Sequence, residues 1–260
     1  RSTLFPYTTL FRSLAEQMKS TGEVMAIGRT FEEALLKGLR SLETGVDGLD
    51  RVETDDGEIA RELSEATDRR ILAMGEALRR GWAPEKVAEA AAWDPFFVGK
   101  LKNIVDMEGR IRAAGRLDDG LLREAKNMGF SDAAIARLAG REEADVRAQR
   151  EGAGVVPFYK TVDTCAAEFE AQTPYFYSTY GARSSEAAPG GGRKVAIIGG
   201  GPIRIGQGIE FDYCCVHGVM ALQEEGAEAI MINNNPETVS TDYDIDRKST
   251  RLNSSHLAES

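Results

Sequence analysis

The sequence predicts two unequal parts, a helical bundle over about Phe31–Arg150 and then an incomplete Rossmann-like α/β unit that begins at Lys194. In the first part, apolar residues recur every three or four positions between Gly, Pro and acidic breaks, which is typical of short amphipathic helices. In the second part, two short apolar runs flank a segment with helical spacing, which indicates a strand, a helix and a strand. A chain of 260 residues is long enough for two ordinary domains.

The helical part begins after Thr30. Its first helix is expected to stop at Gly45 and to carry one apolar stripe, formed by Phe31, Ala34, Leu35, Leu39 and Leu42. The acidic stretch Gly48–Glu62 has few apolar residues and is interpreted as a loop. Thr67 is then expected to cap a helix that ends at Gly81. That helix would bury Ile71, Met74 and Leu78.

The remaining helices are marked by their start and stop residues. Pro84 opens a short alanine-rich helix, and Asp94-Pro95 starts the longest one. The longest helix has one apolar face, formed by Phe97, Leu101, Ile104, Val105 and Ile111. Two more short helices would start at the caps Asp118 and Ser131 and close at Gly129 and Gly140. Core bulk is expected from the aromatic residues Trp82, Trp93, Phe96 and Phe97. No fixed period recurs, so these elements predict a compact bundle.

The α/β unit is predicted from Lys194–Ile198 and Ala227–Asn233, two apolar runs that would pair as parallel strands. The helix between them would carry Phe211, Cys215, Val219 and Leu222 on one face and end at a left-handed Gly226. Before this unit, the connector is expected to be extended at 158–162 and 174–180. Two strands alone cannot close a stable sheet, so we expect slower amide exchange in the bundle.

A glycine loop follows the first of these strands and contains Gly199, Gly200, Gly201 and Gly206. It lacks the lysine that a phosphate-binding loop places after its last glycine, and its spacing does not fit a dinucleotide fingerprint. Two interpretations remain open. The loop could bring a ligand close to the carboxyl end of the strand, or it could be a tight turn without a ligand.

Charge and cysteine content exclude several classes of protein. A net charge of −10 offers no electrostatic attraction to nucleic acid or to an anionic membrane, and no apolar run is long enough to cross a bilayer. The stretch 131–150 has the form of a helix-turn-helix, but its acidic residues argue against DNA binding. Adjacent cysteines on a helix point about 100° apart, so Cys214, Cys215 and His217 are expected to pack in the interior and not to bind a metal.

Three blocks of sequence resemble the large subunit of carbamoyl-phosphate synthetase, in the order in which that family has them. MKSTGEVMAIGRTFEEALLKGLRSLETG is similar to the end of the first ATP-grasp unit and the helix after it. FYKTVDTCAAEFEAQTPYFYSTY is similar to the segment that leads into the second half. GGGPIRIGQGIEFDYCCVH, followed by NNNPETVSTDYD, is similar to the start of that half. The resemblance covers about Leu14 to Asp244.

The resemblance implies a division of the chain. Residues 14–30 would end the preceding ATP-grasp unit, 31–150 would form the oligomerisation domain, 151–193 an extended connector and linker, and 194–247 the start of the second synthetase (pre-ATP-grasp) unit. The ends, 1–13 and 248–260, match nothing in the family, look like adaptor-derived text, and are left out of the expected fold. We therefore expect an internal piece of a longer protein.

The resemblance also implies a function. The family makes carbamoyl phosphate from bicarbonate, ATP and ammonia drawn from glutamine, for arginine and pyrimidine synthesis, with ATP and Mg²⁺ as cofactors and a small glutaminase subunit as partner. Glu23, Gly208, Glu210 and Glu237 match residues that line its internal passage, although capping roles remain open for the glutamates. We expect a cytoplasmic protein that self-associates through its helical part, with no nucleic-acid or membrane partner. This chain holds no complete catalytic set, and a stand-alone interaction module is the alternative.

Overall fold

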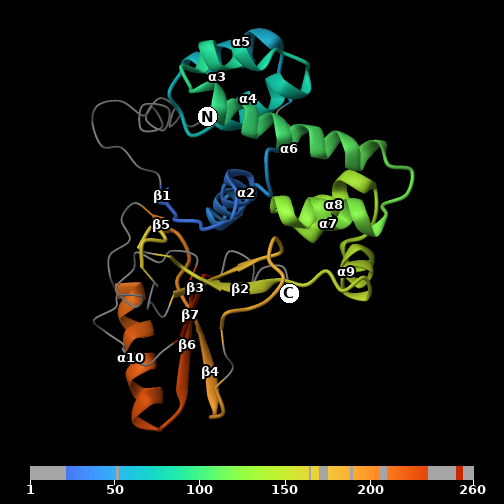
Figure 1. The fold of residues 1–260 in the computed structure, drawn as a ribbon. Coiled ribbons are helices and arrows are strands. Elements are labelled where there is room, and N and C mark those ends of the chain that lie inside the picture. The colour runs from blue at the N-terminus through green and yellow to red at the C-terminus, as the bar shows by residue number, and fades with distance from the viewer. Residues whose placement is uncertain are drawn as a thin grey trace, which may run out of the picture.

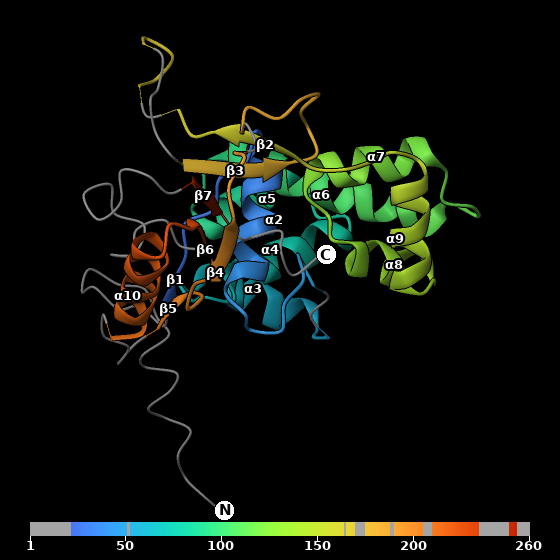
Figure 2. The same cartoon turned by 90° about the horizontal axis from the view of Figure 1, so that it is seen from below.

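The structure is a computed structural model that describes residues 22–50, 53–163, 165–169, 175–187, 190–204, 210–233 and 250–253. Helices α2 to α9 form the first part of the chain, and a mixed sheet with one long helix forms the last part (Figure 1). In Figure 1, α2 lies between the other helices and the sheet, and Figure 2 shows α7 to α9 on one side of α2 and α10 on the other. The expected fold class, a helical bundle followed by a partial α/β unit, is confirmed.

The helical part follows the start and stop signals of the sequence in most places. Its helices are α2 Phe31–Ser41, α3 Asp56–Ser64, α4 Arg70–Arg79, α5 Pro84–Ala91, α6 Pro95–Ala113, α7 Asp119–Met128, α8 Asp132–Ala139 and α9 Glu143–Gly152. The side chains of Asp94, Asp118 and Ser131 each accept a backbone N–H at the start of their helices, as predicted. Gly129 and Gly140 have positive φ at the helix ends, as predicted.

Two predictions of local structure in this part are wrong. The acidic stretch Gly48–Glu62 is not a loop throughout, because α3 begins within it. Asp55 caps α3 by accepting the N–H of Glu58 at 2.9 Å. Ile59 and Leu63 are fully buried and hold α3 on the core, so two apolar residues one turn apart are enough. Thr67 does not cap α4, which begins at Arg70 without a side-chain cap.

The core of the helical part is built around α6, which packs on α2, α4, α5 and α8. Leu101, Ile104 and Ile111 of α6 are completely buried, as the apolar face predicted. The aromatic prediction is only partly right. Trp82 and Trp93 pack against the core from its edge, but Phe96 remains 61% exposed and Phe97 39% exposed. Both lie in the first turn of α6, where Phe97 packs against Phe31 of α2 with ring centroids 5.1 Å apart and Phe96 projects further outward.

The buried face of α2 differs from the predicted stripe. Of the five apolar residues expected there, only Leu39 counts among the buried residues. The face that packs inward includes Glu33, Leu36 and Lys37 instead. Polar residues can occupy such a face only when hydrogen bonds and ion pairs satisfy them. The interior around α2 is therefore partly polar.

The sheet contains the two predicted strands and three more. The strands are β2 Phe158–Thr161, β3 Tyr175–Thr179, β4 Lys194–Ile198, β6 Glu228–Asn233 and β7 Thr250–Asn253, in the order β2-β3-β7-β6-β4. β4 and β6 pair in parallel, as predicted, with Val195 opposite Ala229. Helix α10, Glu210–Glu224, packs on both strands, and Gly226 after it has a φ of 73°. The extended connector segments became β2 and β3, which were not expected to join the sheet.

One strand of this sheet comes from the end of the chain, which was not part of the expected fold. Thr250–Asn253 forms β7, which pairs in parallel with β6 on one side and with β3 on the other. Without it, the facing edges of β3 and β6 would present unpaired backbone groups. Four residues from the segment 248–260 therefore take part in the sheet, while the adaptor-like origin of that segment remains a prediction.

Candidate functional site

The glycine loop begins at the carboxyl end of β4, beside the end of β6. The N–H of Gly199 donates to the carbonyl oxygen of Ile232 at 2.7 Å, which holds the start of the loop on β6. The buried side chain of Asn233 covers the same glycine, since a Cβ on Gly199 would stand 2.7 Å from Asn233 Cγ. A larger residue at 199 would displace that amide. Ligands bind at this edge in open α/β sheets, so the loop is the candidate site.

The helical part reaches this loop from the other side. The carboxylate of Glu43, which follows α2, lies beside Gly201, because a Cβ on that glycine would stand 3.2 Å from Glu43 Oε1. The short strand β1, Gly22–Glu23, pairs antiparallel with β5, Ile203–Arg204, at the end of the loop. The candidate site therefore lies where the segment around α2 meets the carboxyl edge of β4 and β6.

The residues predicted for the site are only partly described. Gly199, Gly200 and Gly201 form the start of the loop, whereas Gly206, Gly208 and Glu237 lie outside the described residues. For Glu23 and Glu210 the backbone is described: Glu23 lies opposite Ile203, and Glu210 begins α10. The fold thus places the backbone of Glu23 next to the loop. The roles of these residues in a passage remain predictions.

Lys37 fixes α2 against the sheet. Its side chain is completely buried, and its ammonium group lies 2.9 Å from the Glu33 carboxylate. The same group donates to the carbonyl oxygens of Ile27 at 2.8 Å and of Ser178 at 2.7 Å. Glu33 also accepts the N–H of Arg29 at 2.8 Å. Two hydrogen bonds to carbonyl oxygens and one ion pair thus compensate the buried charge and join α2 to β3.

A second buried cluster joins the end of β3 to the last helices. Lys126 and Arg150 both pair with Asp132, at 3.0 Å and 2.8 Å, and all three side chains are almost fully buried. Tyr180, directly after β3, packs its ring under both cations, with the Lys126 ammonium 4.7 Å from the ring centroid. This second contact further couples the sheet to the helical part.

Sequence reasoning missed Glu43, Asn233 and Lys37. Asn233 ends a predicted strand in an Asn-rich turn, so its place at the sheet edge was a usable signal. Glu43 and Lys37 are charged residues in the stretch predicted as one amphipathic helix, which favours the interpretation that they face water. Their contacts with residues far along the chain carry no local signature.

Cysteine and metal chemistry find no support in the described part of the chain. No group of three His, Cys, Asp or Glu residues there could hold a metal ion. Burial raises the pKa of the half-buried Cys215 thiol above its usual value, which disfavours the reactive thiolate. Cys214 and His217 are exposed, so the expected interior packing is wrong for these two residues. His217 packs against Tyr213, with ring centroids 4.2 Å apart.

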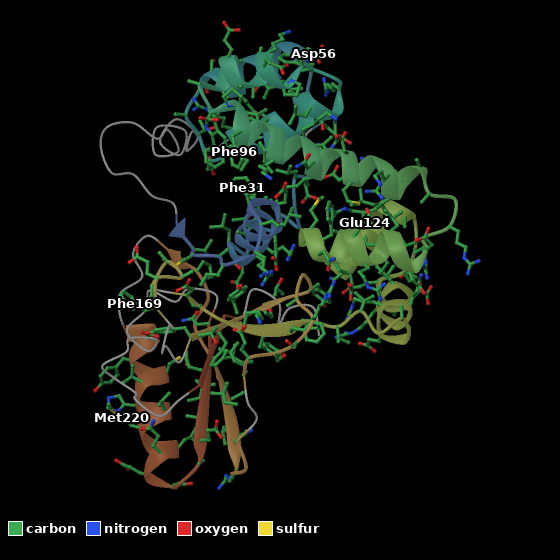
Figure 3. All side chains as sticks on the ribbon, viewed as in Figure 1. Phe31, Asp56, Phe96, Glu124, Phe169 and Met220 are labelled. Atoms are coloured by element: carbon green, nitrogen blue, oxygen red, sulfur yellow. The ribbon has the colours of Figure 1, made fainter. Side chains whose placement is uncertain are left out.

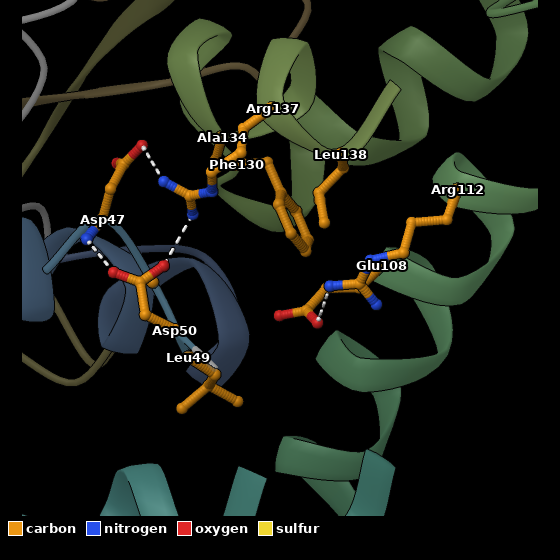
Figure 4. A pocket seen from close by; sticks show the side chains of 10 residues that line it. Asp47, Leu49, Asp50, Glu108, Arg112, Phe130, Ala134, Arg137 and Leu138 are labelled. Atoms are coloured by element: carbon orange, nitrogen blue, oxygen red, sulfur yellow. Dashed lines mark hydrogen bonds and ion pairs between the residues drawn. The ribbon is translucent and has the colours of Figure 1, made fainter. Parts of the chain in front are cut away.

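A separate pocket of about 390 Å³ lies in the helical part, between the α2–α3 loop, α6 and α8 (Figure 4). Its two arginines already pair with acids: Arg137 lies 2.6 Å from Asp50, and Arg112 lies 3.0 Å from Glu108. Binding an anion there would compete with these pairs. The glycine loop is therefore the stronger candidate.

Family comparisons agree with the two parts of the fold. A model of the oligomerisation domain of the carbamoyl-phosphate synthetase large chain matches residues 23–154, more than half of the chain. A model of the carbamoyl phosphate synthase preATP-grasp domain matches residues 191–252. The chain belongs to the carbamoyl-phosphate synthetase large-chain family. The matched oligomerisation domain contains α2 to α9, and the preATP-grasp match contains the glycine loop and β7 up to Leu252.

Curated relatives are carbamoyl phosphate synthase large chains from several organisms. That of Methanothermobacter thermautotrophicus is 52% identical over 237 residues, which are 91% of this chain and 22% of the relative. That of Rhizobium meliloti is 52% identical over 246 residues, 89% of this chain and 21% of the relative. The chain thus spans about a fifth of the length of these large chains. Within the described ranges, no helix combines the length and apolar character needed to cross a membrane.

Proposed function

We propose that this chain is an internal segment of a carbamoyl-phosphate synthetase large chain that supplies self-association and part of an internal passage. The observation that carries the proposal is the joining of the two family domains: residues from both flanks of α2 meet the glycine loop at the sheet edge. The passage would be lined by Glu23, Gly208, Glu210 and Glu237. The helical part would bind a second copy of the large chain.

The whole protein would make carbamoyl phosphate in the cytoplasm from bicarbonate, ATP and ammonia. Ammonia would come from glutamine through a small glutaminase subunit, and the product would feed arginine and pyrimidine synthesis. Binding of ATP and Mg²⁺ would belong to other segments of the whole protein. The residues described here do not fit these cofactors, because the described part of the loop offers no phosphate-binding lysine and no acidic cluster converges beside it.

The first test is catalysis by the purified chain. Incubated with ATP, Mg²⁺ and bicarbonate, with or without ammonia, the chain is expected to release phosphate no faster than buffer. Turnover of ~1 per second, an ordinary enzyme rate, would contradict the assignment of the catalytic groups to other segments.

The second test is self-association. Light scattering over a concentration series is expected to show a mass that rises above that of the 28.3 kDa monomer. A strictly monomeric mass at high concentration would count against the proposed role of the helical part. Sequencing the intact locus separates the two origins of the chain: flanking ATP-grasp halves support the enzyme segment, and start and stop codons at the present ends support a stand-alone interaction module.

A further inference from the structure

The turn after α2 holds a glutamate in an unusual backbone conformation. Glu43 comes two residues after the end of α2 and has a φ of 52°, in the left-handed region that residues other than Gly and Asn seldom adopt. Its N–H donates to the carbonyl oxygen of Arg40 at 3.0 Å, which ties the turn to the helix. Gly is the usual residue for this conformation at a helix end. A glutamate there calls for an explanation outside the helix.

That explanation is the contact with the glycine loop. A Cβ on Gly201 would stand 3.2 Å from Oε1 and 3.5 Å from Oε2 of Glu43, so the carboxylate and the loop backbone approach closely. Gly201 itself has a φ of 84°. A side chain at 201 would therefore meet both an unfavourable backbone conformation and the carboxylate. The two residues, from separate parts of the fold, constrain one another.

The segment before α2 also contacts the loop, at β5, and is itself fixed in place. β1, before α2, pairs with β5, so that Gly22 lies opposite Arg204. Between β1 and α2, the carbonyl oxygen of Ile27 accepts a hydrogen bond from buried Lys37, which also bonds Ser178 in β3. Gly201 and β5, both in the described part of the loop, thus meet the two flanks of one anchored helix.

We propose that Glu43 is a positioning residue through which the helical part sets the conformation of the glycine loop. It acts on the loop backbone and not on a reacting group. The proposal rests on the proposed function only in assigning the loop to the lining of the passage. Glu43 is not among the residues that the family resemblance placed there, and it would make the oligomerisation domain a structural support of the preATP-grasp edge.

Hydrogen–deuterium exchange of the complete 260-residue chain tests the contact directly. Glu43→Gly removes the carboxylate and accepts the left-handed backbone without strain, whereas Glu43→Gln keeps the length and a hydrogen-bond acceptor. We expect amides of residues 199–204 to exchange about five- to tenfold faster in Glu43→Gly, the effect of losing one modest hydrogen bond or charge contact. Glu43→Gln should restore part of the protection, and α6 should not change.

Glu65 provides a control for loss of a glutamate at a helix end, because it is an exposed glutamate directly after α3, with an ordinary φ of −89° and far from the loop in sequence. Glu65→Gly and Glu65→Gln should leave exchange of 199–204 unchanged. Unchanged exchange of 199–204 in Glu43→Gly would overturn the proposal. So would equal acceleration in all elements with a lower unfolding midpoint, because Glu43 would then serve only overall stability.

A double-mutant cycle tests whether the effect passes through Gly201. Gly201→Ala places a methyl group against the carboxylate and should accelerate exchange of the loop. Combined with Glu43→Gly, its effect should be smaller, because the clash is gone and only the backbone strain remains. Purely additive effects would rule out direct contact. None of these results depends on self-association or on turnover, so the proposed function can fail while the role of Glu43 stands, and the reverse.

Discussion

The helical part surrounds its apolar core, whereas the α/β unit leaves one face of its edge strand β4 open. On α6, Leu101 and Ile104 have no exposed surface. On β4, residues alternate between half-buried and exposed: Ile197 faces α10, where it approaches Gly218, and Ile198 on the other face is 75% exposed. Figure 3 shows the side chains crowded between the helices of the first part.

This difference indicates where each part gets its stability. The helical part has a continuous buried apolar core of its own, the main source of folding stability. The sheet gains further contacts at its interface with the helices. Lys37 donates a hydrogen bond to the carbonyl oxygen of Ser178, and Lys126 and Arg150 pack on the ring of Tyr180. Amide exchange should therefore be slowest in α6 and faster in β4 and β6. Slower exchange in these two strands than in α6 would contradict this order.

The largest expected effect comes from removing the Lys37 contacts at the interface between the helices and the sheet. Lys37→Met leaves buried Glu33 without its ammonium partner and should lower the free energy of unfolding by about 3–5 kcal/mol, as removal of one partner of a buried pair does. Urea denaturation followed by circular dichroism measures the change. Lys102→Met is the matched control, because Lys102 forms an exposed pair with Asp106 on α6 and should contribute about 0–1 kcal/mol.

A double substitution shows whether the loss comes from the unpaired charge. Lys37→Met with Glu33→Gln removes both charges and should recover part of the stability. A double variant as unstable as the sum of the two single variants would assign the effect to packing. If Lys37 holds the sheet on the helices, the amide exchange rates of β3 and β4 should also rise more than those of α6.

Helix caps should give the next largest effect, confined to the helical part. Asp118 accepts the N–H of Leu121 at 2.8 Å at the start of α7, so Asp118→Ala should cost about 1 kcal/mol. Glu142 stands at the same position of α9 without a side-chain cap hydrogen bond, and Glu142→Ala should change stability by less than about 0.5 kcal/mol. Thermal unfolding of both variants measures the difference, and equal losses would contradict the capping role.

The cap residues were predictable from sequence because a cap is a local pattern. Asp94, Asp118 and Ser131 and the glycines that end α7 and α8 each act within one helical turn. Thr67 shows the limit of such patterns, since a suitable residue type stood near α4 without capping it. The parallel pair β4 and β6 was predictable for a similar reason, because its strands and helix are consecutive.

The interface between the helices and the sheet and the support of the glycine loop were not predictable, because they depend on contacts between distant parts of the chain. Lys37 and Ser178 are 141 positions apart, and nothing near a lysine in a helix indicates that a carbonyl group from a later strand will accept a hydrogen bond from it. Glu43 stands out only through its positive φ, which the structure shows. A sequence indicates a positive φ only where the residue is Gly or Asn. The glycines of the loop were recognisable, but their neighbours were not.

A smaller effect is expected from one matched substitution placed in each region. Ile104→Val removes a methyl group from a site without exposed surface and should cost about 0.5–1.5 kcal/mol. Ile198→Val removes the same group from the open face of β4 and should change stability by less than about 0.5 kcal/mol. Equal losses would show that the open face of the sheet is covered in solution, for example by self-association.

The smallest expected effect is a change in how acid unfolds the helical part. Burial raises the pKa of Glu76, but hydrogen bonds from Arg80 and Arg79 outweigh it, so the pKa lies below its ordinary value of 4.5. A carboxyl group with a lowered pKa in the folded state contributes stability that is complete above the ordinary pKa and is lost as the pH falls through the folded value. The unfolding midpoint should therefore fall as the pH drops from about 5 to about 3, and Glu76→Gln should make that fall shallower. Glu89→Gln, at an exposed position on α5, should leave the slope unchanged. If both variants follow the original slope, other carboxylates determine the acid response, and the Glu76 pairs do not contribute to the difference between the two regions.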